Sequence, residues 1–339
     1  MRAIVWQGDK RFEVQEVPKP VPGPGQILVK VEAAAVCSSD MHLADFRCKA
    51  PLIPGHEVAG TVEELGEGVN GFALGDRVAL DPVQRCGSCW CCLNQCEHLC
   101  ANYRHLGDRE IAGGWAEYVA IDAVNAHLIP PGIPFEAAAL TEPSAVCFHS
   151  LHRARLEPGQ DVLVLGDGPF AFLHTQLALA LGARKVVVVG HMDQRLRRIT
   201  QTTGVPVCNS LTEDVDEFVR SHFGLPGPDA AIEASGSPEA PDVALRLLRP
   251  RGTLVIFSYI WDPKPITVGL IHMRELNVVG SCRSWNAYEP CLRLMSEGRI
   301  NTMALVDLQA ALSDCNRVLT CLQDRKPEIF KAVFRPQWE

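Results

Sequence analysis

The sequence predicts an α/β chain with two domains, one mainly β and the other built on a doubly wound parallel sheet. Six short apolar runs between residues 161 and 280 lack polar alternation, as strands covered by helices on both faces do. The region before them contains short strands separated by glycine-rich turns. A length of 339 residues exceeds what one hydrophobic core usually organises, which supports two domains.

Composition excludes several classes of protein. Hydrophobic residues make up 47% and charged residues 21%, which is typical of a globular enzyme. A net charge of −8 argues against a nucleic-acid partner, and no apolar run approaches the ~20 residues that span a membrane. The start of the chain lacks the long apolar core of a secretory signal. Fourteen cysteines in this setting predict thiols and metal sites in a reducing compartment, so we expect a cytoplasmic protein.

The N-terminal region is expected to be mainly β. Strands are predicted at residues 29–36, 58–65 and 76–80, with a turn at Gly66 to Gly68 between the last two. Four prolines between residues 18 and 24 indicate an extended entry, because proline donates no hydrogen bond to a sheet. Polar side chains at the strand ends are the first candidates for chemistry.

Cys37, His56 and Glu57 form a plausible zinc ligand set in this region. Zinc accepts sulfur, imidazole and carboxylate, and a catalytic site keeps three protein ligands and one open position. The alternative is a buried cysteine, a hydrogen-bonded core histidine and a surface glutamate.

Four cysteines follow with the spacing C-x2-C-x2-C-x7-C, at Cys86, Cys89, Cys92 and Cys100. Four thiolates on one short loop predict a closed tetrahedral site, which is typical of a structural zinc. A redox-active cysteine cluster is the alternative. Cys91 and Cys96 are surplus to the four ligands.

With these motifs the chain resembles the zinc-dependent branch of the medium-chain dehydrogenase/reductase family, which includes alcohol, sorbitol and threonine dehydrogenases. The resemblance extends over nearly the whole chain and also rests on residues 113–118 (GGWAEY) and on Glu142-Pro143. It implies a GroES-like, mainly β catalytic domain at residues 1–147 and a Rossmann coenzyme domain at 148–283. Residues 284–339 would then return to the catalytic domain.

The resemblance also implies roles for individual residues. Cys37 and His56 would bind a catalytic zinc, and Glu142 matches the position where polyol-type members place a carboxylate. Glu57 would be a fourth or exchanging ligand. For Glu142 the alternative is an acid at a helix N-terminus, because Pro143 suits the first helical position.

Three polar residues near Cys37 are expected to support this zinc. Asp40 would orient His56, since a ligating histidine usually donates its other N–H to a carboxylate, or it is an ordinary helix N-terminal acid. By the resemblance, Ser39 and His42 would pass the alcohol proton to solvent, and an imidazole suits such transfer near neutral pH. The alternative for His42 is an exposed histidine that contacts the coenzyme ribose.

A strand, a glycine turn and a helix follow one another at residues 161–181, as a dinucleotide-binding motif requires. Gly166 and Gly168 would allow a tight turn close to the coenzyme pyrophosphate, with Pro169 and Phe170 opening the helix on which it rests. Ala171 replaces the third glycine, which the motif permits.

The type of coenzyme depends on the end of the next strand, where NAD enzymes usually carry an acid for the ribose 2′-hydroxyl. Here Gly190 and His191 stand at that place, with Arg195, Arg197 and Arg198 nearby. This pattern leans slightly towards NADP. The alternative is that Asp193 serves NAD and that the arginines form a solvated helix face.

The C-terminal region is predicted to contain a helix at residues 288–300, a helical stretch at 308–322 and a strand at 329–335. Lys331 falls where relatives carry a basic residue near the pyrophosphate, but a surface lysine on an edge strand is the favoured interpretation. Trp115, Phe46 and Trp285 are candidates for side chains that line the substrate pocket, but core packing is the favoured interpretation for each.

The sequence therefore predicts a dehydrogenase that uses a catalytic and a structural zinc to transfer hydride between NAD(P) and a secondary alcohol, polyol or sugar-type substrate. Alternatives are a zinc-dependent reductase of a biosynthetic carbonyl and a non-enzymatic zinc- and nucleotide-binding protein. By the resemblance, a homodimer or homotetramer is expected.

Overall fold

The computed structural model describes residues 1–43, 45, 48–108, 111–324 and 328–338. The chain divides into two compact units, one formed by residues 1–143, 288–297 and 301–339 and the other by residues 144–287 and 298–300. The first unit is therefore completed only after the chain has traversed the second. In the part of the chain that the structure describes, none of the helices has the length and apolar character needed to span a membrane.

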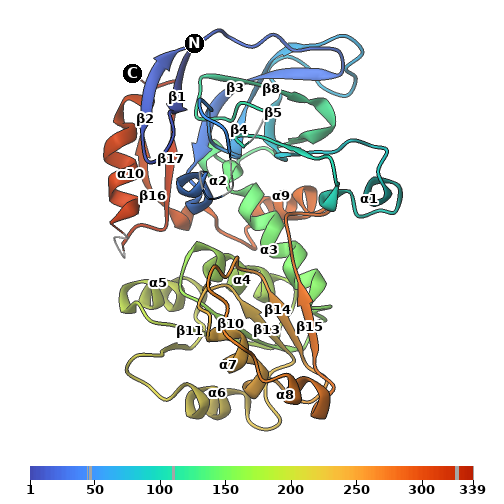
Figure 1. The fold of residues 1–339 in the computed structure, drawn as a ribbon, viewed down its shortest axis with the longest axis vertical. Helices are drawn as coiled ribbons and strands as arrows, with labels where there is room; N and C mark the ends of the chain where they lie inside the picture. The colour runs from blue at the N-terminus through green and yellow to red at the C-terminus, as the bar shows by residue number, and fades with distance from the viewer. Residues whose placement is uncertain (44, 46–47, 109–110, 325–327, 339) are drawn as a thin grey trace. The chain divides into compact units, whose positions relative to one another are not determined.

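The second unit contains a six-stranded parallel sheet (Figure 1). Its strands, in the order β12-β11-β10-β13-β14-β15, confirm the doubly wound prediction. Their bounds are β10 Asp161–Leu165, β11 Lys185–Gly190, β12 Val207–Asn209, β13 Ala230–Glu233, β14 Thr253–Ile256 and β15 Asn277–Gly280. All five residues of β10 are buried, as expected for a strand covered on both faces.

Five helices connect these strands: α4 Pro169–Ala180, α5 Asp193–Thr203, α6 Val215–Phe223, α7 Ala240–Leu247 and α8 Val268–Met273. α4 packs on β10 and β11, and α7 packs on β13 and β14. The strand order reverses between β10 and β13, so the glycine turn after β10 lies at the point where such sheets bind ligands.

The first unit is built around a seven-stranded sheet with the order β16-β17-β3-β4-β5-β9, with β8 also paired to β3 (Figure 1). The bounds are β3 Gln26–Ala35, β4 Glu57–Leu65, β5 Arg77–Leu80, β8 Tyr118–Asp122, β9 Ala126–Leu128, β16 Val306–Ala310 and β17 Lys331–Phe334. Two strand pairs are separate from this sheet: β1 Arg2–Trp6 with β2 Phe12–Glu16, and β6 Val83–Gln84 with β7 Arg104–His105.

Short helices complete this unit: η1 Ser38–His42, α1 Trp90–Leu93, η2 Glu97–Leu99, η3 Ala123–Asn125, α2 Phe135–Ala139, α9 Tyr288–Ser296, η4 Met303–Leu305, η5 Leu312–Asp314 and α10 Cys315–Gln323. The chain passes from one unit to the other within α3 Thr141–Arg153.

Two predictions in the C-terminal region need correction. The helical stretch predicted at residues 308–322 is wrong in its first part, because Val306–Ala310 forms strand β16. Parallel pairing with β17 satisfies this backbone, and five residues are too few for periodicity to distinguish helix from strand. α9 ends at Ser296 rather than at residue 300, shortly before Gly298 with its φ of +67°.

Trp115 is the largest side chain buried completely in the core of the first unit. Its ring lies 5.2 Å from that of Phe334 and 6.0 Å from that of Phe12, which confirms core packing. A Cβ at Gly55, where φ is +97°, would lie 2.2 Å from the Trp115 ring. Only glycine therefore fits beside this tryptophan, directly before His56.

We expect the substitution Trp115→Ala to lower the free energy of unfolding by about 3–5 kcal/mol, because it empties a fully enclosed aromatic site. Urea unfolding followed by circular dichroism measures this loss. Val21→Ala is the control, since Val21 is 83% exposed and its truncation should cost less than about 0.5 kcal/mol. Equal midpoints for the two variants would contradict a central role for Trp115.

Candidate functional site

Three neighbouring strands in the interior of the seven-stranded sheet, β17, β3 and β4, bring the polar candidates together near their ends. In the antiparallel register, Ala35 of β3 lies opposite Glu57 of β4 and Val333 of β17. Cys37 follows β3 by two residues, and His56 directly precedes β4. Pairing of the strands therefore places residues distant in sequence side by side.

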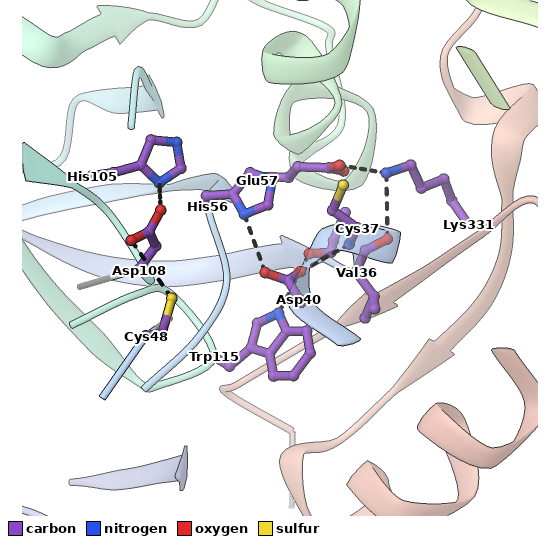
Figure 2. Close-up of polar contacts among 11 residues, drawn as sticks. Val36, Cys37, Asp40, Cys48, His56, Glu57, His105, Asp108, Trp115 and Lys331 are labelled. Atoms are coloured by element: carbon purple, nitrogen blue, oxygen red, sulfur yellow. Dashed lines mark hydrogen bonds and ion pairs between the residues drawn. The ribbon is translucent and has the colours of Figure 1, made fainter. Parts of the chain in front are cut away.

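Cys37, His56 and Glu57 offer sulfur, nitrogen and oxygen atoms that all lie within 4.8 Å of one another (Figure 2). The three residues are buried, and Glu57 has no exposed surface. A thiol, an imidazole and a carboxylate at this spacing form a donor set that suits zinc.

Asp40 connects two of these residues. Its Oδ1 lies 3.1 Å from His56 Nδ1, and its Oδ2 accepts a 2.9 Å hydrogen bond from the backbone N–H of Cys37 (Figure 2). Because Nδ1 is occupied, Nε2 is the ring nitrogen left for a metal. Asp40 also lies in the first turn of η1. It is therefore both an acid at a helix N-terminus and the partner of His56, so the two interpretations offered for it do not exclude each other.

Glu57 forms a buried ion pair with Lys331 (Figure 2). The Lys331 ammonium donates to Glu57 Oε1 and to the carbonyl of Val36, 3.3 Å away, and Lys331 is only 3% exposed. The other carboxylate oxygen, Oε2, has no hydrogen-bond partner among the residues that the structure describes. A buried oxygen without a partner is costly, so Oε2 is a natural ligand for a cation.

The interpretation of Lys331 as a surface lysine on an edge strand is wrong. β17 lies between β16 and β3, and its four residues are all buried. The cue in the sequence was a single lysine within the apolar segment Ile329 to Phe334, where a charge needs an internal partner.

The electrostatics of the cluster favour positive charge. Burial alone lowers the pKa of His56, but the charge of Asp40 and hydrogen bonds to Asp40 and Cys37 raise it well above its ordinary value. Burial also lowers the pKa of Lys331, and the charges of Glu57, Cys37 and Glu142 raise it. Negative groups therefore outweigh desolvation at this point of the fold.

Glu142, in the first turn of α3, lies outside the tight group of three ligand atoms. Burial, followed by the neighbouring charge of Glu57, raises its pKa to about 7, while His56 and Lys331 act in the opposite direction. The charges of His56, Glu57 and Lys331 thus act on the Glu142 carboxyl. Its role as a metal ligand stays a prediction.

Ser39 and His42 lie on η1, directly after Cys37. Ser39 is half-buried and His42 is exposed, with its Nδ1 2.8 Å from Asp45 Oδ2. The helix therefore leads from the buried cluster to the molecular surface. Phe46, one of the guessed lining residues, lies outside the described residues.

The four-cysteine loop has the geometry of a second metal site. The sulfurs of Cys86, Cys89, Cys92 and Cys100 all lie within 4.8 Å of one another, with separations of 3.5 Å for Cys89–Cys92 and 3.7 Å for Cys89–Cys100. A tetrahedral zinc with bonds of about 2.3 Å holds its sulfurs about 3.8 Å apart.

The thiol pKa values in this loop shift in both directions, because burial, followed by hydrogen bonds to Cys89 and Cys100, raises the pKa of Cys92 to about 12, whereas backbone groups lower that of Cys86. The N–H groups of Ser88 and Cys89 lower the pKa of Cys86 to about 5, which favours the thiolate that zinc needs. Cys91 and Cys96 are not part of the four-sulfur group, and Cys96 Sγ instead lies 3.4 Å from the Cys91 carbonyl. Within the described structure all fourteen cysteines are free thiols.

The glycine turn after β10 adopts the geometry that close approach of a ligand requires. Gly166 has a φ of +137°, and a Cβ there would lie 2.7 Å from the Ala234 carbonyl oxygen. Gly168 caps α4, and Pro169 begins this helix. Phe170 follows, with its ring 5.0 Å from that of Phe257. The N-terminus of a twelve-residue helix thus opens directly beside the turn.

Sequence reasoning missed a polar pair close to His56. The His105 ring lies 5.4 Å from that of His56, and His105 Nδ1 lies 3.8 Å from Asp108 Oδ2 (Figure 2). Both residues follow the four-cysteine loop without a recognisable motif. Trp285, the remaining guessed lining residue, packs against His149 and His152 at ring separations of 6.4 Å.

Known proteins are similar to this chain in both sequence and fold. The family described as "Alcohol dehydrogenase GroES-like domain" matches residues 23–131, and "Zinc-binding dehydrogenase" matches residues 172–297. A sorbitol dehydrogenase of Halalkalibacterium halodurans is 31% identical over 99% of both chains.

Two crystal structures superpose on nearly the whole chain. A putative zinc-binding dehydrogenase from Sinorhizobium meliloti 1021, bound to NADP, has a TM-score of 0.92 and 30% identity over 99% of both chains. An alcohol dehydrogenase from E. coli CFT073 in complex with NADH has a TM-score of 0.92 and 25% identity, also over 99% of both chains.

The buried ion pair generates a stability prediction. We expect Lys331→Met to lower the free energy of unfolding by about 3–5 kcal/mol, because it leaves the Glu57 carboxylate buried without its cation. The double variant Glu57→Gln/Lys331→Met should recover a large part of this loss, since the unpaired charge is gone. Urea unfolding of the four forms in a double-mutant cycle measures the coupling.

Lys19→Met is the matched control, because Lys19 pairs with Glu64 at the surface. It should cost less than about 1 kcal/mol. Additive effects of the Glu57 and Lys331 substitutions would contradict the pairing.

Proposed function

The chain belongs to the zinc-dependent medium-chain dehydrogenase family and is a zinc- and NAD(P)-dependent oxidoreductase of the alcohol dehydrogenase type; within this class we propose that it oxidises a secondary alcohol of polyol or sugar type. The observation that carries the proposal is the convergence of Cys37, His56 and Glu57 in one buried group, in which Asp40 contacts the His56 ring.

A catalytic zinc fits these residues. Cys37 and His56 provide sulfur and nitrogen, and Glu57 provides the unpartnered Oε2. Glu142 is a second carboxylate whose pKa responds to the charges of this group. We propose that it completes the ligand set, with Glu57 as a fourth or exchanging ligand. When bound, zinc supplies a Lewis acid for a hydroxyl oxygen and the nicotinamide supplies a hydride acceptor.

The residues after Cys37 are proposed to carry the proton away. Ser39 is half-buried, and His42 stands at the surface with Asp45 2.8 Å from its ring. A proton received by the Ser39 hydroxyl passes to the His42 imidazole, where the Asp45 carboxylate stabilises the charged ring before release to solvent.

The coenzyme is proposed to lie over the glycine turn. Gly166 and Gly168 leave room for the pyrophosphate, and the backbone N–H of Phe170 and those that follow it in the first turn of α4 are proposed to face it, after Pro169, which has no N–H to donate. His191 and Arg195 follow β11, where the adenosine ribose is expected, and glycine occupies position 190, so we propose that NADP is accepted slightly better than NAD.

A structural zinc in the four-cysteine loop and a homo-oligomer complete the proposal. The sulfur separations suit a closed tetrahedral ion. β15 is an edge strand with exposed Asn277, Val278 and Gly280, and an exposed strand edge favours pairing with a second copy as a dimer or tetramer.

Two features support a substrate of polyol or sugar type. A relative of similar length is a sorbitol dehydrogenase, and Glu142 stands where the resemblance places the carboxylate of polyol-type members. His105 and Asp108 near His56 add polar groups suited to further hydroxyls of such a substrate.

A screen of polyols, sugars, secondary alcohols and ethanol with NAD and NADP, followed by absorbance of the reduced nicotinamide, tests this function. Polyols or sugars should be oxidised faster than ethanol, and Cys37→Ser should lower the rate at least about 100-fold because a ligand is lost. Full activity in Cys37→Ser would contradict the mechanism. Reduction of activated carbonyls without alcohol oxidation would favour a biosynthetic reductase.

Metal content provides a second test. Protein equilibrated with zinc and analysed by mass spectrometry should contain two zinc ions per chain, one for each ligand group. Cys89→Ser should lose one ion, and Cys37→Ser should lose the other. The matched control, Cys91→Ser, should lose none, because Cys91 lies outside both groups. A similar zinc loss in Cys91→Ser would overturn the assignment of the loop ligands.

The orienting role of Asp40 gives a third test of the proposed function. Asp40→Asn should weaken zinc binding at the Cys37 and His56 site by about 10- to 100-fold, since the ring loses its carboxylate partner. Competition with a chromophoric chelator measures both sites in the same sample. The four-cysteine site serves as an internal control and should keep its affinity.

A further inference from the structure

The end of β11 carries no acidic residue, but a carboxylate from the glycine turn, that of Asp167, lies at the same place in the fold. Asp167 lies between Gly166 and Gly168 and is 5% exposed. A Cβ built on Gly190 would lie 2.6 Å from the Asp167 Cβ and 2.7 Å from its Oδ2. The Asp167 side chain therefore fills the space that a side chain at position 190 would need, and the two exclude each other.

Asp167 is held firmly at this position. Its Oδ2 accepts 2.7 Å hydrogen bonds from the backbone N–H groups of His191 and Met192, directly before α5. His191 Nδ1 lies 3.4 Å from the same oxygen. The loop that follows β11 is thus fixed to the glycine turn through one carboxylate.

The second oxygen of Asp167 faces a cation. Oδ1 lies 4.0 Å from a guanidinium nitrogen of Arg195, which is too far for a hydrogen bond. This oxygen keeps the capacity to accept a hydrogen bond from a hydroxyl group. A carboxylate with an open oxygen and an arginine therefore stand together at the end of the second strand, where the adenosine ribose of a dinucleotide binds.

We propose that Asp167 sets the choice between NAD and NADP in this chain. Its carboxylate replaces the strand-end acid and accepts a hydrogen bond from the ribose hydroxyl of NAD. For NADP the same charge opposes the 2′-phosphate, while Arg195 attracts it. These opposed charges keep the preference for NADP slight. The inference rests on the proposed coenzyme site at the glycine turn.

Binding of ADP-ribose and 2′-phospho-ADP-ribose, measured by titration calorimetry on the zinc-loaded full chain, tests the role of Asp167. The wild type should bind the two within about tenfold of each other. Asp167→Asn keeps an oxygen for the backbone N–H groups and removes the charge, so the affinity ratio should move at least tenfold towards the phosphorylated ligand. Arg195→Gln should move the ratio at least fivefold the other way.

Asp193→Asn is the matched control. Asp193 begins α5 and accepts a 2.5 Å hydrogen bond from Asn209, so removal of its charge should leave the ratio within twofold. An unchanged ratio in Asp167→Asn, or an equal shift in Asp193→Asn, overturns the inference. If Asp167→Asn does not fold, an unchanged ratio in Arg195→Gln overturns it.

The titration requires no alcohol substrate, so it separates this inference from the proposed function. Absence of binding by both nucleotides would overturn the coenzyme site and the inference together. Normal nucleotide discrimination in a protein that oxidises no alcohol would refute only the proposed substrate class.

Discussion

Charge balance inside the first unit is the constraint on which the site depends. Glu57 has no exposed surface, and the cation that faces it, Lys331, is supplied by a strand 274 residues away in sequence. An unpaired carboxylate at this depth would cost several kcal/mol, so the strands β17, β3 and β4 must meet in one register. The same register positions Cys37 and His56. Stability and chemistry are therefore imposed by one set of strand pairings.

Asp40 of the first unit and Asp167 of the second unit are both fixed by hydrogen bonds from backbone N–H groups. Asp40 accepts one backbone N–H, that of Cys37, and Asp167 accepts two, in each case just before a helical segment. The other carboxylate oxygen lies near His56 for Asp40 and near Arg195 for Asp167. A side chain anchored in this way gains a fixed direction, because its hydrogen bonds to the backbone restrict its rotamer. Both residues thus couple local folding to the geometry of a neighbouring site.

Much of the fold was accessible from the sequence, because apolar runs without alternation and a glycine turn before a helix are local signals. The four-cysteine loop was equally local, because its spacing is a recognisable motif within fifteen residues of sequence. The partner of Glu57 could not be found in this way, because it depends on the pairing of β17 with β3. The strand at Val306–Ala310 was missed for the same reason, since a neighbouring strand decides its conformation. At Gly190 the sequence revealed a missing acid but not the side chain that takes its space.

The discontinuous first unit has a consequence for biosynthesis. The second unit, residues 144–287 and 298–300, is fully translated before Lys331, the ion-pair partner of Glu57 in the first unit, is added to the chain. During this interval the nascent thiol, imidazole and carboxylate lack their final enclosure. The enclosure of Cys37, His56 and Glu57 is therefore completed only after Lys331 has been translated.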